Sequence, residues 1–77
     1  MATKDHLKDI NDAARKENRP NTIDPAIIDA LPDDATNYMP TGHLQGPGGT
    51  WHYMFDLPGG GQVDLTVTGA ERQQHGI

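Results

Sequence analysis

Two stretches of alternating apolar and polar residues, 51–57 and 63–67, constrain the fold more than any other feature of this chain. Side chains two positions apart in a strand share a face, so this period of two predicts a β-hairpin with one apolar face. The connection, residues 58–62, reads Pro-Gly-Gly-Gly-Gln, and its glycines accept turn conformations that other residues avoid. The hairpin holds the only Trp and the only Phe of the chain, so the core has to form against it.

The apolar pattern also predicts a register for this hairpin. With both apolar sets on one face, we expect Phe55 opposite Leu65, Asp56 opposite Asp64, and a three-residue turn at 59–61. Like charges directly opposite each other destabilise a sheet, so the two aspartates are a candidate functional pair. At about 5 Å they could receive a Lys or Arg from a partner or share a divalent cation. The alternative is a solvated acidic face.

Capping signals predict two helices before the hairpin. Within the N-terminal segment 1–20, Thr3 can cap a helix over residues 4–17 whose apolar stripe is narrow. The pair Asp24-Pro25 is typical of a second helix start, which gives a short helix within residues 21–31.

The remaining segments are expected to be largely irregular. Residues 32–50 are rich in Pro, Gly, Asp and Thr and are predicted to be a loop, with 36–39 as a candidate short strand. Residues 69–77 offer little to bury and are predicted to be a mobile tail. The chain is therefore expected to fold as one small α+β domain, residues 1–77, with short helices packed on a small antiparallel sheet.

Composition narrows the chemistry that this chain can carry. It contains no Cys and no Ser, which excludes disulfides, thiolate metal sites and the common nucleophiles. The four His lie on separate segments without metal-ligand spacing, and neither glycine-rich segment is followed by the Lys-Ser/Thr of a phosphate loop. We therefore expect no enzymatic activity, no cofactor and no metal. The chain has no apolar run of membrane-spanning length and begins with polar residues, so a cytoplasmic protein is expected.

Charge is distributed unevenly along the sequence and gives the best functional clue. The net charge is −5, and residues 20–71 contain no Lys or Arg but seven carboxylates. Such a surface repels nucleic acid and anionic membranes and favours a basic protein partner. The alternative is that acidic charge only keeps a small protein soluble. An aromatic patch of Trp51 and Tyr38 with Met39 is expected to be partly exposed beside the acids.

These features predict a non-enzymatic protein that docks on a basic, nucleic-acid-binding surface of a larger partner and inhibits it by competition. In size, charge and lack of cysteine the chain resembles small acidic inhibitors of bacteriophages and mobile elements, including some anti-CRISPR proteins, although no motif is shared. The alternative is a structural protein that forms a homodimer through the hairpin edge or the aromatic face. The residues expected on the partner-binding surface are Asp29, Asp33, Asp34, Asp56, Asp64, Glu71, Tyr38 and Trp51.

Overall fold

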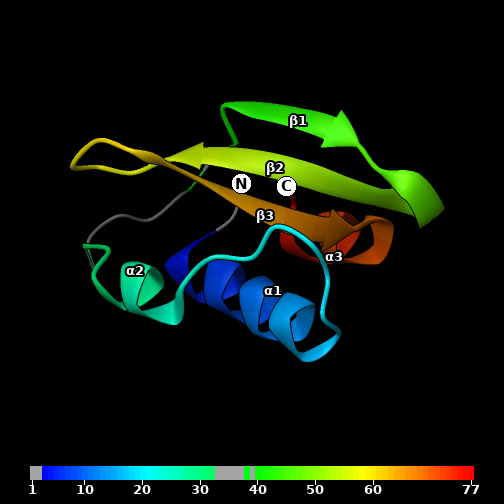
Figure 1. The fold of residues 1–77 in the computed structure, drawn as a ribbon, viewed down its shortest axis with the longest axis horizontal. Coiled ribbons are helices and arrows are strands. Elements are labelled where there is room, and N and C mark those ends of the chain that lie inside the picture. Colours follow the sequence, from blue (N-terminus) through cyan, green and yellow to red (C-terminus); the bar gives the residue numbers. More distant parts are fainter. Residues whose placement is uncertain (1–2, 33–37, 39) are drawn as a thin grey trace.

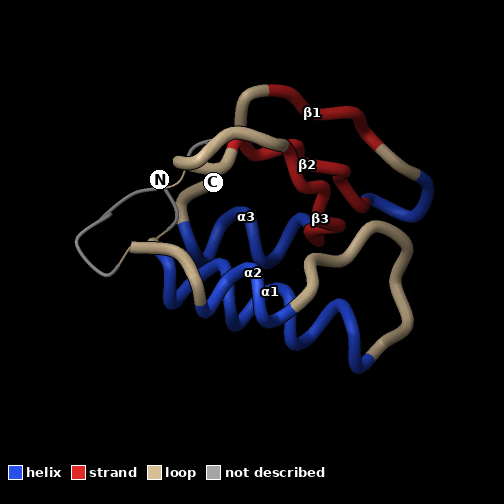
Figure 2. Tube along the Cα trace, turned by 60° about the vertical axis from the view of Figure 1, so that its left-hand side comes forward, coloured by secondary structure: helices blue, strands red, loops and turns tan. Residues whose placement is uncertain are grey.

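The computed structural model describes residues 3–32, 38 and 40–77 and confirms the α+β class. Its elements, in chain order, are α1 (Lys4–Lys16), α2 (Pro25–Asp29), β1 (Gly42–Gln45), the 3-10 turn η1 (Pro47–Gly49), β2 (Thr50–Asp56), β3 (Gln62–Thr68) and α3 (Gly69–His75). The strands form an antiparallel sheet in the order β1-β2-β3 (Figure 1). The helices lie together on one side of this sheet (Figure 2). No helix in the described part of the chain has both the length and the apolar character needed to cross a bilayer.

Both predicted helix starts are confirmed, because their signals are local. The Thr3 hydroxyl accepts a hydrogen bond from the His6 N–H at 3.3 Å and caps α1. The Asp24 carboxylate accepts from the Ala26 N–H at 3.0 Å, and Pro25 occupies the first position of α2. Helix α1 packs its buried side against β3 and α2.

The hairpin keeps its predicted apolar face, but the predicted register is wrong by two residues. Phe55 lies opposite Val63, Asp56 opposite Gln62, and Asp64 opposite Met54, so the two aspartates do not face each other. The connection is a five-residue loop, 57–61, closed by a hydrogen bond from the Leu57 N–H to the Gly61 carbonyl at 3.0 Å. A shift of two residues leaves every side chain on its original face, so apolar alternation does not distinguish the two registers.

Strand β1 arises within the segment that was predicted to be a loop. The candidate strand at 36–39 lies outside the described residues except for Tyr38. The observed strand begins at Gly42, opposite Met54, and ends at Gln45, opposite Trp51. It has no apolar alternation, so only its backbone pairing with β2 identifies it as a strand.

The predicted mobile tail is wrong, since residues 69–75 form helix α3. The Thr68 hydroxyl accepts from the Glu71 N–H at 3.2 Å, and the Glu71 carboxylate accepts from the Thr68 N–H at 3.0 Å. This reciprocal pair is a capping box. Gly76, with φ 68°, ends the helix in the left-handed conformation that glycine adopts without strain.

The core lies between the sheet and the helices. Tyr53 and Phe55 of β2 and Leu65 and Val67 of β3 are buried on the helix side of the sheet. They meet apolar side chains from the two N-terminal helices and the segments beside them, namely Leu7, Ile10, Ala14, Ile23, Ile28, Leu31 and Tyr38.

Candidate protein-binding face

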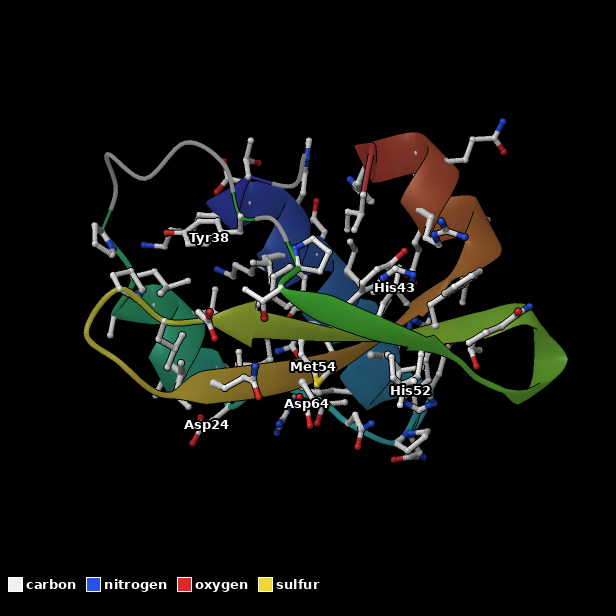
Figure 3. All side chains as sticks on the ribbon, turned by 90° about the horizontal axis from the view of Figure 1, so that it is seen from above. Asp24, Tyr38, His43, His52, Met54 and Asp64 are labelled. Carbon is white, nitrogen blue, oxygen red and sulfur yellow. The ribbon has the colours of Figure 1, made fainter. Side chains whose placement is uncertain are left out.

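One face of the sheet is turned away from the helices and carries the candidate site. Because side chains alternate along a strand, the residues that flank the buried aromatics of β2 point to this opposite side. In Figure 3, His52, Met54 and Asp64 lie on it, whereas His43 and Tyr38 lie on the helix side. We refer to this surface as the open face, and its members are Leu44, His52, Met54, Asp56, Gln62, Asp64 and the buried Thr66.

The open face carries two exposed carboxylates that form no ion pair with a described residue. Asp64 lies opposite Met54 and Asp56 opposite Gln62, whose amide donates to Asp56 Oδ1 at 3.4 Å. None of the three strands contains Lys or Arg, and no ion pair between described residues involves either aspartate. The Asp24 side chain points toward the same side (Figure 3). The electrostatic potential at this face is therefore negative.

Apolar groups lie beside these carboxylates. Leu44 is 68% exposed and is the only large apolar side chain that is exposed in the described part of the chain. Met54 is half-buried, and its methyl group lies over Gly42, where an added Cβ would be only 2.6 Å from it. An exposed apolar group with a polar, charged rim is typical of a protein-binding surface.

A cross-sheet hydrogen bond orients His52. Asn21 Nδ2 donates to His52 Nδ1 at 2.7 Å, which links the segment after α1 to the middle of the open face. Sequence reasoning missed Asn21, since nothing in its neighbourhood indicates a partner 31 positions away.

Three of the expected partner-binding residues lie elsewhere. Tyr38 is buried in the core, so the expected exposed aromatic patch is wrong for this residue, while Met39 lies outside the described residues. Trp51 is half-buried on the helix side, with the Arg72 guanidinium 4.0 Å from its ring centroid. Glu71 is bound within the molecule, because Arg19 contacts its carboxylate oxygens at 2.6 and 3.3 Å.

The Arg19–Glu71 pair is held against the sheet. Their side chains are 10% and 15% exposed, and Arg19 also donates to the Thr66 carbonyl at 3.2 Å. Burial disfavours the charged carboxylate, but the hydrogen bonds from Arg19 and Thr68 outweigh it, so the pKa of Glu71 is lowered. The pKa of Arg19 is raised, chiefly by its hydrogen bond to Glu71.

The other predicted acids differ in how they are placed. Asp29 is exposed at the end of α2, and Asp56 and Asp64 are exposed on the open face. Asp33 and Asp34 lie outside the described residues. The structure thus places two of the six predicted acids on one surface.

The β2 edge of the hairpin is paired, and the edge of β3 is covered at Thr66. The outer side of β2 pairs with β1, and along β3 the Asn21 carbonyl accepts from the Thr66 N–H at 2.8 Å. The Thr66 hydroxyl donates to the Pro20 carbonyl. The aromatic face lies against the helices, and β1 is the edge strand on the side of the sheet away from residues 19–21.

Metal ligands do not gather among the residues that the structure describes, where no three His, Asp or Glu side chains form a group that could hold an ion. His6 and His75 do meet, with ring centroids 4.6 Å apart, at the junction of α1 and α3. Comparison of the chain with protein-family models, with curated proteins and with solved structures found no match.

Proposed function

We propose that this chain is a non-enzymatic module that binds a basic surface of a larger protein through its open face. The observation that carries the proposal is the pair of exposed carboxylates, Asp56 and Asp64, on strands that have no Lys or Arg. Leu44 and Met54 supply apolar contact area beside these carboxylates. Complementary charge steers association and fixes orientation, while apolar groups supply contact energy.

The partner chemistry follows from that surface. Basic protein surfaces are often nucleic-acid-binding grooves, so a module seated there competes with the phosphate backbone. Inhibition by such competition, in the cytoplasm of a host cell, is the mode that we propose. It is the mode of small acidic inhibitors of phages and mobile elements, including some anti-CRISPR proteins.

Replacing both aspartates, Asp56→Asn with Asp64→Asn, is expected to weaken partner binding by about 1 to 3 kcal/mol. The change removes two charges and keeps side-chain size. Both side chains are exposed, so the free energy of unfolding is expected to stay within about 0.5 kcal/mol of wild type. Calorimetric titration and urea denaturation measure the two quantities.

A matched control removes the same charge from another surface. Asp9 and Asp12 are exposed on α1, so Asp9→Asn with Asp12→Asn alters net charge equally without touching the sheet. We expect this variant to bind almost as wild type does. Equal weakening by the two variants would mean that net charge, rather than the open face, determines binding.

The partner can be identified by capture from a cell lysate at about 0.05 M and about 0.5 M salt, since salt screens exposed charges. The expected result is a stoichiometric nucleic-acid-binding protein that is retained only at low salt and is displaced by its own nucleic acid. Retention at both salts, or failure of nucleic acid to compete, would contradict charge-driven competition.

A further inference from the structure

The outer edge of β1 presents backbone groups that no described segment covers. The Gly46 N–H donates to the Thr50 carbonyl at 2.7 Å, and in an antiparallel pair such bonds recur at every second residue. Gly42 and Leu44 therefore direct their backbone groups to β2, whereas His43 and Gln45 direct theirs outward. In Figure 1, β1 forms the upper boundary of the sheet, with no described segment above it.

Strand β1 lacks two of the features that usually keep edge strands apart, charged residues and proline. Proteins protect such edges with charged residues, prolines inside the strand, bulges or a covering segment. Residues 35–55 contain no charged side chain, although the chain as a whole is 22% charged. Strand β1 contains no proline, and Leu44 exposes its side chain at the centre of the edge.

We propose that β1 pairs with β1 of a second copy of this chain, antiparallel, about a twofold axis that passes beside Leu44. In this register His43 of each copy lies opposite the partner's Gln45, and Leu44 lies opposite the partner's Leu44. Both outward residues then exchange N–H and C=O with the other copy, and the two leucine side chains meet on the same side of the joined sheet.

Charge favours a second copy as the occupant of this edge. Each copy carries a net charge of −5, so two copies repel each other over most of their surfaces. At the β1 edge the uncharged segments of two copies would be in contact, because the carboxylates of the open face lie on β2 and β3. A charged partner would form no ion pair at this edge. The Leu44 side chains of two copies, in contrast, can pack on each other across the twofold axis. This pairing does not depend on the proposed function.

The association is expected to be weak, so the fraction of dimer should rise with protein concentration. A four-residue strand buries little area, and interfaces below about 1,000 Å² are typically transient. Sedimentation equilibrium of the full chain from about 10 µM to about 1 mM should show a mass that rises from 8.4 kDa toward twice that value. A mass that stays at 8.4 kDa over this range would overturn the proposal.

Substitutions of opposite charge at position 44 test whether the two Leu44 side chains meet at the twofold axis. Leu44→Lys and Leu44→Glu should each weaken self-association at least about tenfold, because like charges then face each other. An equimolar mixture of the two variants should associate again, since Lys faces Glu. Failure of the mixture to recover, or unchanged association of either single variant, would show that the leucines do not meet.

Two further variants separate this contact from general effects. Gln62→Lys places the same charge on the open face but away from the β1 edge, and we expect it to self-associate as wild type does. Gln45→Pro removes an outward N–H while leaving the side chain of Leu44 in place, and it should weaken association as the position 44 variants do. Circular dichroism of each variant checks that the fold is retained.

Discussion

Replacing Asn11 with alanine is expected to lower the free energy of unfolding by about 2 to 4 kcal/mol, since two buried backbone groups lose their partner at once. Asn11 is fully buried in α1, at 0% exposure. Its amide donates to the Ile23 carbonyl, and its side-chain oxygen accepts from the Ile23 N–H, both at 2.8 Å. Urea denaturation followed by circular dichroism measures the loss.

The matched control is the next residue along the same helix. Asp12 is exposed, so Asp12→Ala should change stability by no more than about 0.5 kcal/mol. Asn11→Asp tests the hydrogen bond that the Asn11 amide donates. A charged carboxylate still accepts from the Ile23 N–H, but it has no proton to donate to the Ile23 carbonyl. A loss below about 1 kcal/mol for Asn11→Ala would mean that water replaces the amide.

Glu71→Gln is expected to destabilise the protein by about 1 to 3 kcal/mol at neutral pH, because it removes the charge that faces Arg19. The pKa of Glu71 is lower in the folded chain than its ordinary value. Its charged form therefore stabilises the fold above the unfolded pKa of about 4.3, and this contribution is lost as the pH falls through the folded pKa. The difference in free energy of unfolding between wild type and Glu71→Gln should thus be largest near neutral pH and should approach zero in acid.

Thermal unfolding of both proteins from about pH 7 down to about pH 2 measures this difference. Glu17→Gln is the control, because Glu17 contacts the same Arg19 at 2.7 Å but is 60% exposed at its side chain. Exposed ion pairs contribute little, so we expect it to differ from wild type by no more than about 0.5 kcal/mol. A stability difference for Glu71→Gln that persists unchanged in acid would show that the carboxylate charge is not responsible.

The sequence predicts the elements whose signals lie within a few residues of each other. Thr3 and the pair Asp24-Pro25 mark helix starts because each cap bonds to a backbone N–H two or three positions away. The capping box of Thr68 and Glu71 is an equally local signal, whereas the prediction of a mobile tail rested on the lack of apolar residues. Helix α3 was thus predictable from the spacing of these two residues.

The register and strand β1 depend on information that side-chain patterns do not contain. Closure of the 57–61 loop uses positive φ angles at Gly60 and Gly61, and a run of three glycines permits several such closures. Strand β1 exposes its one large apolar residue, Leu44, so no burial pattern identifies it. The hairpin register and the position of β1 are therefore determined by backbone geometry, which the side-chain pattern does not encode.

The candidate site was predicted in part, for a similar reason. Exposed Asp56 and Asp64 follow from strand alternation, which is a local rule. The fate of Glu71 depends on Arg19, 52 positions earlier, and the burial of Tyr38 depends on core contacts with the helices. Charge alone does not tell which carboxylate stays on the surface and which is bound within the molecule.

The backbone contacts along the outer side of β3 limit how large an assembly of this chain can grow. Asn21 and Pro20 occupy that side through Thr66, and Arg19 fixes the same strand. A sheet that pairs at one side only ends once a second copy has joined it, whereas a sheet open at both sides adds copies indefinitely into fibres. Residues 19–21 therefore oppose strand addition at the Thr66 end of β3, which favours a closed dimer over a fibre.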